Sequence, residues 1–297
     1  MSRRAARRWF LRGSAGAGLA LALPPQLGAA PPAPLDLLVI TDTHLGYRDQ
    51  EHARRQWELT AGELARAAGR LIVHLGDVVD GGREAQYAVY REIRDRIGKP
   101  VHEIPGNHDP PELFARHLRA ALDTVVDVDW LRLILLQNSR PDSHAGFLTP
   151  AQLDWLDQRC AEAAREQRLV IVGMHVPAHT NAHPDRGWYV QPRDGQTALY
   201  ELLARHRPRI LALFHGHFHN GLRGWDDHPP CHEICFPSAL YNQDRKLQAQ
   251  GANGYNAPEF RPGYTRVRLS PERLELVYQP VGVEQGWRQE LARPGNE

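Results

Sequence analysis

The sequence predicts an α/β domain, and two observations support this fold class. Five apolar runs have the length and composition of buried strands, and stretches with helical periodicity lie between them. Within three residues of its end, each run is followed by an aspartate, an asparagine or a histidine. Ligands of α/β sheets gather at the carboxyl ends of the strands, so the same pattern predicts a site at those ends.

The elements follow in order along the chain. Apolar runs predict strands at residues 35–41, 70–75, 101–104, 124–128, 131–137, 169–174 and 210–215, and then near 222–225, 231–236, 264–269 and 274–278. Helical periodicity predicts helices at residues 48–68, 84–97, 110–122, 150–167 and 196–207. In the first helix, Trp57, Leu59, Leu64 and Ala68 are expected on the buried side. Thr149, which precedes a proline, is expected to cap the fourth helix.

Five short motifs at the strand ends carry the candidate chemistry. In chain order they are Asp42-Thr43-His44, Gly76-Asp77-Val78-Val79-Asp80, Gly106-Asn107-His108-Asp109, His175 and Gly216-His217-Phe218-His219. Asn107 offers a neutral carbonyl oxygen to a metal, and His108 offers an imidazole that can donate a proton near neutral pH. A structural role is expected for Asp109. Each motif is weak alone, but the chance assembly of all five is improbable.

The ordered set of motifs resembles the calcineurin-like metallophosphoesterases over residues 35 to about 270, and most closely the bacterial cyclic-nucleotide phosphodiesterase branch. The resemblance implies a four-layer αββα sandwich, with two mixed β-sheets flanked by helices and two divalent metal ions at the strand ends. It further implies that a hydroxide bridging the metals hydrolyses a small phosphoester, with a phosphodiester favoured.

The resemblance also implies a role for each matched residue. One metal would be held by Asp42, His44, Asp77 and His219. The other would be held by Asp77, Asn107, His175 and His217, so that Asp77 bridges the two ions. Such ligands suit Mn, Fe, Zn, Co or Ni. His108 would protonate the leaving group, and Asp80 would orient that histidine.

Two motif positions differ from those of related branches of the family, and each difference argues against one of those branches. The second motif lacks the tyrosine ligand of purple acid phosphatases, and Gly81 stands where Ser/Thr protein phosphatases have an arginine. A phosphomonoesterase or protein phosphatase of the same fold remains the alternative activity. A metal-binding protein without turnover is a further alternative, although Asp80 and His108 are needed for turnover and not for metal binding.

Composition limits the possible partners. The 297 residues carry a formal net charge of +1, whereas a protein that wraps a nucleic-acid duplex would show a basic stripe. No duplex partner is therefore expected. Of the three cysteines, Cys160 is expected in the core, while Cys231 and Cys235 could form a small loop disulfide or lie along a strand. The oligomeric state is left open.

The two ends of the chain are expected to lie outside the domain, which we place at residues 35–280. Arg7-Arg8-Trp9-Phe10-Leu11-Arg12 resembles the twin-arginine export signal, and the apolar stretch after it is shorter than the ~20 residues that span a bilayer. Residues 1–30 are therefore expected to be a signal peptide read by the twin-arginine export machinery, followed by a tether at 31–34. The protein would then reach the bacterial periplasm without further membrane contact. An uncleaved membrane anchor is the alternative. Residues 281–297 are expected to be a loosely held tail.

Overall fold

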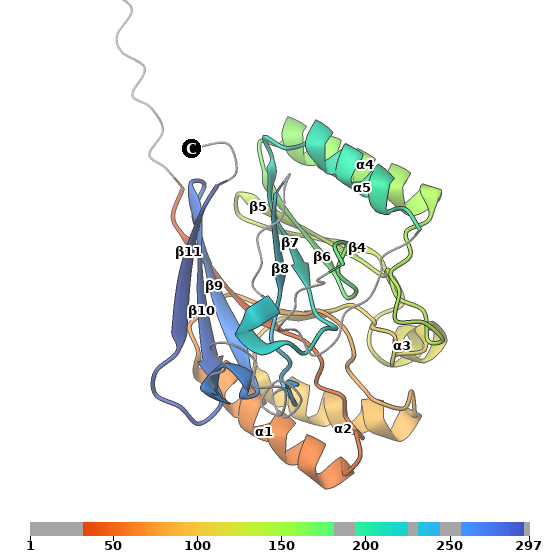
Figure 1. Cartoon of the computed structure of the whole chain (residues 1–297), viewed down its shortest axis with the longest axis vertical. Helices are drawn as coiled ribbons and strands as arrows, with labels where there is room; N and C mark the ends of the chain where they lie inside the picture. The colour runs from red at the N-terminus through yellow and green to blue at the C-terminus, as the bar shows by residue number, and fades with distance from the viewer. Residues whose placement is uncertain (1–31, 181–193, 225–230, 244–256, 294–297) are drawn as a thin grey trace, which may run out of the picture. The chain divides into compact units, whose positions relative to one another are not determined.

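In the computed structural model, residues 32–180, 194–224, 231–243 and 257–293 can be described, and they form two mixed β-sheets flanked by helices (Figure 1). The first sheet has the strand order β11-β10-β9-β1-β2-β3 and the second has the order β4-β5-β6-β7-β8. Strands β1, β2 and β3 are parallel to one another, as are β5, β6, β7 and β8. Antiparallel strands β9 and β4 join these parallel blocks to form the mixed sheets.

The strands and helices have the following bounds. In the first sheet these are β1 (Leu35–Ile40), β2 (Ile72–His74), β3 (Val101–Glu103), β9 (Gly263–Leu269), β10 (Arg273–Pro280) and β11 (Trp287–Ala292). In the second they are β4 (Thr124–Val128), β5 (Leu131–Leu136), β6 (Leu169–Met174), β7 (Ile210–His215) and β8 (His232–Cys235). The α-helices are α1 (Gln50–Arg66), α2 (Glu84–Arg94), α3 (Pro111–His117), α4 (Pro150–Arg165) and α5 (Gln196–Arg205), and the 3-10 helices are η1 (Asp95–Ile97), η2 (Gly221–Gly224) and η3 (Ala257–Phe260).

Three apolar layers hold these elements together. Alternate residues of β1 serve two of them: Leu37 and Val39 face the second sheet, while Leu38 and Ile40 pack in the layer that contains residues of α1 and α2. The other face of the second sheet packs with residues of α4 and α5. Strands that are buried on both faces have continuous apolar sequences, and these sequences predicted the strands. The expected four-layer αββα sandwich is confirmed.

Three local expectations were wrong. Leu59 lies on the exposed side of α1, with 58% of its surface accessible, and Ala68 is exposed beyond the end of this helix, although the helix itself forms as predicted. Residues 222–225 were expected to form a strand, but Gly221–Gly224 form η2, which starts at a glycine with φ of 60°. The tail is not loosely held over Trp287–Ala292, because these residues form β11 against β10 and bury Leu291 in the layer between the sheets. Polar residues surround that leucine, so the apolar signal of the strand is weak.

Other expectations fall on particular side chains or outside the described residues. The Thr149 hydroxyl accepts from the backbone N–H of Gln152 and caps α4, as predicted. Cys160, Cys231 and Cys235 are all buried and none is in a disulfide. The expected signal peptide lies outside the described residues, as does Pro31. Within the described residues, no helix combines the length and apolar character needed to cross a membrane.

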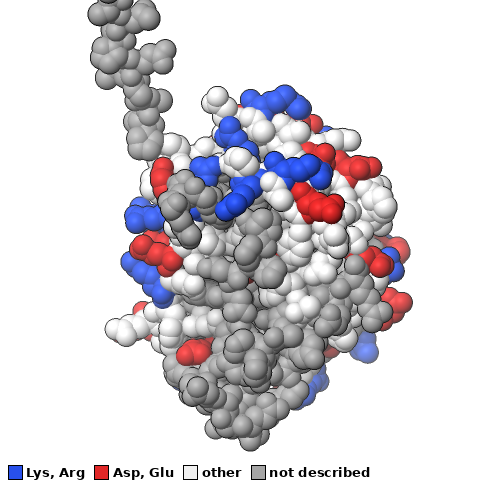
Figure 2. Space-filling model, turned by 45° about the horizontal axis from the view of Figure 1, so that its top comes forward, with Lys and Arg blue, Asp and Glu red and all other residues white. Residues whose placement is uncertain are grey.

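Charged side chains of both signs share the surface. Figure 2 shows Lys and Arg beside Asp and Glu on the described part of the face in view. Ion pairs between exposed side chains include Arg116 with Glu84 and Arg205 with Asp157. This mixture of charges agrees with the near-zero net charge of the chain.

Candidate metal centre

The five motifs converge because they follow neighbouring parallel strands. The first three follow β1, β2 and β3, and the last two follow β6 and β7. Backbone hydrogen bonds tie them together: Asp42 N–H donates to Gly76, His44 N–H donates to Asp77, and Gly216 N–H donates to His175. The predicted site at the carboxyl ends of the strands is therefore assembled.

Backbone strain is concentrated in these motifs. The φ angles are positive at Asp42 (56°), His44 (40°), Asp77 (54°), His217 (77°) and His219 (51°). The left-handed region costs a non-glycine residue about 1–2 kcal/mol, and such residues persist only where the surroundings hold them. Strain at five converging positions is typical of a functional site.

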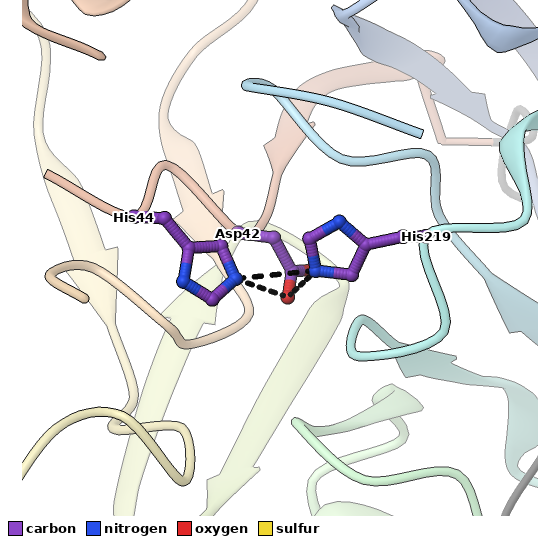
Figure 3. Close-up of side chains that lie close together, drawn as sticks. All are labelled: Asp42, His44 and His219. Carbon is purple, nitrogen blue, oxygen red and sulfur yellow. Dashed lines mark hydrogen bonds and ion pairs between the residues drawn. The ribbon is translucent and has the colours of Figure 1, made fainter. Parts of the chain in front are cut away.

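The first cluster consists of Asp42, His44 and His219 (Figure 3). Asp42 Oδ1 lies 3.0 Å from His219 Nε2 and 3.6 Å from His44 Nε2. The two Nε2 atoms are 3.1 Å apart, and all three residues are buried. Three donor atoms that face one another at such distances could share one cation.

The second cluster consists of Asp77, His175 and His217. His175 Nε2 lies 3.2 Å from Asp77 Oδ2 and 3.2 Å from His217 Nδ1. The same Asp77 oxygen lies 3.4 Å from Nε2 of His44, which belongs to the first cluster. One carboxylate oxygen therefore faces both clusters.

Each of the four histidines has a hydrogen-bond partner on its outer nitrogen. These pairs are His44 Nδ1 with Asp80 Oδ1 (3.2 Å), His175 Nδ1 with the Leu75 carbonyl (2.7 Å), His217 Nε2 with the His144 carbonyl (3.0 Å) and His219 Nδ1 with the Tyr241 carbonyl (2.8 Å). Because these partners accept, the outer nitrogen carries the hydrogen. The other nitrogen of the neutral ring then presents its lone pair to the cluster, which is the tautomer that binds a metal.

Two buried oxygens support the fit to a cation. Asn107 is buried, and its Oδ1 has no hydrogen-bond partner among the described residues. Asp42 Oδ1 also lacks a hydrogen-bond donor there. Buried acceptors without donors are costly unless something else satisfies them. Together with the imidazole lone pairs, they form a donor set that fits borderline divalent metals.

The clusters bind protons tightly when no metal is present. Burial lowers the pKa of His44, but the carboxylates of Asp77, Asp42 and Asp80 outweigh burial and raise it to about 10. Burial also opposes protonation of His175, and Asp77 raises its pKa to about 9. For Asp77, burial favours the neutral form, but the charges of these histidines hold its pKa below the usual range. A metal ion would replace these protons, since ligands must be deprotonated.

His108 lies at the edge of the clusters and is more accessible than they are, with 35% of its side chain exposed. Its Nδ1 lies 2.8 Å from the backbone carbonyl of Asp80 and 3.4 Å from the Asp80 carboxylate. That carboxylate is closer to His44, at 3.2 Å. Asp80 is thus placed to orient both histidines. His108 and Asn107 line a cavity of about 430 Å³ that could admit a ligand.

The Asp109 side chain links the loops that carry the second and third motifs. Its carboxylate is fully buried and accepts from the backbone N–H groups of Val78, Val79 and Gly106 and from the Tyr87 hydroxyl, at 2.9–3.1 Å. Asp77 and His108 lie in the loops that it connects. The structural role expected for Asp109 agrees with these contacts.

The sequence did not predict that the backbone carbonyl groups of His144 and Tyr241 would accept hydrogen bonds from the cluster histidines. Both act through the backbone, so their residue types carry no signal. His144 lies in the loop after β5 and Tyr241 in the loop after β8, away from any motif. The aromatic ring of Tyr241 lies 4.3 Å from the His219 ring.

Comparisons with known proteins agree with this geometry. The family model described as calcineurin-like phosphoesterase matches residues 35–221. The chain is 29% identical to the 3',5'-cyclic adenosine monophosphate phosphodiesterase of Pseudomonas aeruginosa over 255 residues, which is 80% of this chain and 87% of the relative. It is 27% identical to the glycerophosphodiester phosphodiesterase of Enterobacter lignolyticus, over 61% of this chain and 69% of that protein.

A solved structure shows the same fold. A dimetal phosphatase from Danio rerio superimposes with a TM-score of 0.65 at 14% identity, covering 88% of this chain and 98% of that one. The family model, the fold and the clustered metal ligands lead to one conclusion. The chain belongs to the calcineurin-like phosphoesterase family and is a metal-dependent phosphoester hydrolase.

Proposed function

We propose that this hydrolase cleaves phosphodiesters with the aid of two divalent ions that share Asp77. The first ion would be held by Asp42, His44, Asp77 and His219, and the second by Asp77, Asn107, His175 and His217. The observation that carries the proposal is Asp77 Oδ2, which lies within 3.4 Å of one histidine nitrogen from each cluster. Relatives named as phosphodiesterases for cyclic nucleotides and for glycerophosphodiesters favour a diester over a monoester.

The ions, when bound, would lower the pKa of water and neutralise the charge of the phosphate. The residues of the chain supply the rest. Outer hydrogen bonds hold the four imidazole rings in one orientation, so the ligand geometry is preorganised. His108 is accessible from the cavity and would protonate the leaving oxygen, while the carbonyl of Asp80 keeps its ring in place.

The experiment compares two diesters that differ in their need for a proton. Nitrophenolate leaves bis(p-nitrophenyl) phosphate as a stable anion, whereas 3',5'-cyclic adenosine monophosphate expels an alkoxide that must be protonated. For Asp77→Asn, we expect the Mn-loaded protein to lose turnover of both. For His108→Ala, we expect kcat to fall by about 10²–10⁴ with the cyclic nucleotide and by much less with the nitrophenyl ester.

Three results would count against this proposal. Wild-type turnover by both variants would show that the mechanism is wrong. Equal losses by His108→Ala on the two diesters would remove its role as a proton donor. Activity confined to p-nitrophenyl phosphate, a monoester, would favour the phosphomonoesterase alternative.

We also propose that residues 1–30 direct export to the periplasm through the twin-arginine machinery. The support is the sequence of residues 7–12, because this segment lies outside the described structure. The test is fractionation of a bacterial host that expresses the full chain or an Arg7→Lys/Arg8→Lys variant. We expect the wild type in the periplasm and the variant in the cytoplasm. The same location for both would refute the proposal.

A further inference from the structure

An aromatic pair lies directly beside the first cluster. The rings of Tyr47 and Tyr241 stack with their centroids 4.5 Å apart and their planes at 15°. The Tyr241 ring lies 4.3 Å from the His219 ring, and the Tyr47 ring lies 6.2 Å from that of His44. The two stacked tyrosine rings thus lead from the proposed metal ligands to Tyr47, which is partly exposed at the surface.

The loop that carries Tyr241 is held in place. Asn242 is buried, and its Oδ1 accepts from the backbone N–H groups of Ser238 and Gly221. The Tyr241 carbonyl accepts from His219 Nδ1 at 2.8 Å. The position of this ring is therefore coupled to a metal ligand, so a group that packs against the pair is placed relative to the reacting phosphate.

The pair lines a groove of about 610 Å³ that also contains cationic side chains. Arg48 and Arg55 are exposed in this groove, and the Arg48 guanidinium lies 5.0 Å from the centre of the Tyr47 ring. Among the described residues, neither arginine pairs with a carboxylate. Of the described residues that line the groove, Asp49 alone is acidic, and it caps α1 by accepting from the Glu51 N–H. An anionic ligand with a planar group would complement this surface.

We propose that the groove is a subsite for the nucleobase of a nucleotidyl phosphodiester, and that the base stacks on Tyr47. This inference rests on the proposed phosphodiesterase function. The arm that leaves would lie beside His108, in the separate cavity of about 430 Å³, and the arm that is retained would lie in the groove. Stacking of a base on an aromatic side chain tolerates different bases, because every base has a π face. The exposed Arg48 guanidinium, which lies over the same ring, would shift to the outer face of the base and stack on it as a planar cation.

The test uses two substrates with the same leaving group. Thymidine 5'-(p-nitrophenyl phosphate) retains a nucleoside after cleavage, and methyl p-nitrophenyl phosphate retains a methyl group. The measured quantity is the ratio of their kcat/KM values for the Mn-loaded protein. We expect the wild type to favour the thymidine ester by about tenfold, mainly through KM, since one stacked base supplies about that factor.

Substitutions of Tyr47 test whether this side chain causes the preference for the thymidine ester. Tyr47→Ala and Tyr47→Leu should lower the ratio toward one, and the leucine variant keeps apolar volume in case the alanine variant folds poorly. Tyr47→Phe keeps the ring and should keep the ratio. Leu59→Ala, on the exposed side of α1, should change neither ratio nor activity.

The possible outcomes separate this inference from the proposed function. A wild-type ratio near one, or a ratio that Tyr47→Leu leaves unchanged, overturns the base subsite while diester hydrolysis stands. If the wild type cleaves neither diester but cleaves p-nitrophenyl phosphate, the proposed function fails, and the subsite fails with it.

Discussion

Replacement of Asp109 by asparagine tests whether its carboxylate holds together the two loops that carry the second and third motifs. Asp109 Oδ2 accepts from the N–H groups of Val78 and Gly106, both at 2.9 Å, and Oδ1 accepts from Val79 N–H and the Tyr87 hydroxyl. In Asp109→Asn, the amide can keep the Oδ1 contacts. Its NH₂ group, however, would face two buried N–H donors. The loss of two charge-assisted hydrogen bonds at about 1.5 kcal/mol each predicts that the free energy of unfolding falls by about 3 kcal/mol.

The assay is thermal unfolding of the metal-free protein, followed by circular dichroism. For a domain of this size, about 3 kcal/mol corresponds to a Tm that is lower by about 6–12 °C. Asp129→Asn is the matched control, since its side chain is 53% exposed and asparagine tolerates its φ of 51°. This control should stay within about 0.5 kcal/mol of the wild type. If Asp109→Asn unfolds at the same temperature as Asp129→Asn, the carboxylate does not hold the two loops together.

Three further predictions follow from the contacts of the site and of the last strand. At each of the two sites, the apparent Mn²⁺ affinity should fall as pH falls below 9, by up to about tenfold per pH unit. Each ion must displace one proton, from His44 at the first site and from His175 at the second, whose pKa values are about 10 and 9 without metal. Titration calorimetry at pH 6, 7 and 8 measures this, and a pH-independent affinity would contradict it. Asp80→Ala should weaken metal binding about 10–100-fold, since the Asp80 carboxylate orients His44; unchanged affinity by the same calorimetry would show that Asp80 serves only His108. Leu291→Ala should lower the free energy of unfolding by about 2–3 kcal/mol in urea titration because Leu291 is buried between the sheets, and no change would indicate that β11 contributes nothing.

The sequence predicted much of the fold because buried parallel strands and amphipathic helices have strong periodic signals. In the run before Asp42, the residues on both faces of the strand are mainly apolar, which identifies a strand covered on both faces. The signal failed where few side chains are buried. In β11 only Leu291 is buried, and in η2 the chain turns at Gly221 instead of extending. In the first helix, periodicity identified the helix but wrongly placed Leu59 and Ala68 on its buried side.

The side chains of the site could be predicted better than their supports. Asp77 and His217 stand in recognisable motifs, and the structure brings them into one cluster. The carbonyl acceptors depend on the course of loops, which no residue type in the sequence specifies. Asp80 shows a further limit. Its carboxylate was expected beside His108, from which it lies 3.4 Å, but its second contact, 3.2 Å from His44, depends on side-chain rotation within the folded loop and was not predicted.

The central claim is that two cation sites share one aspartate, and metal content tests it most directly. Metal-free protein is titrated with Mn²⁺, the excess is removed, and manganese per chain is counted by elemental analysis. We expect about two ions in the wild type and in His108→Ala, and fewer than one in Asp77→Asn, which weakens both sites at once. If the wild type retains a single ion, or Asp77→Asn still retains two, the shared-aspartate arrangement is wrong.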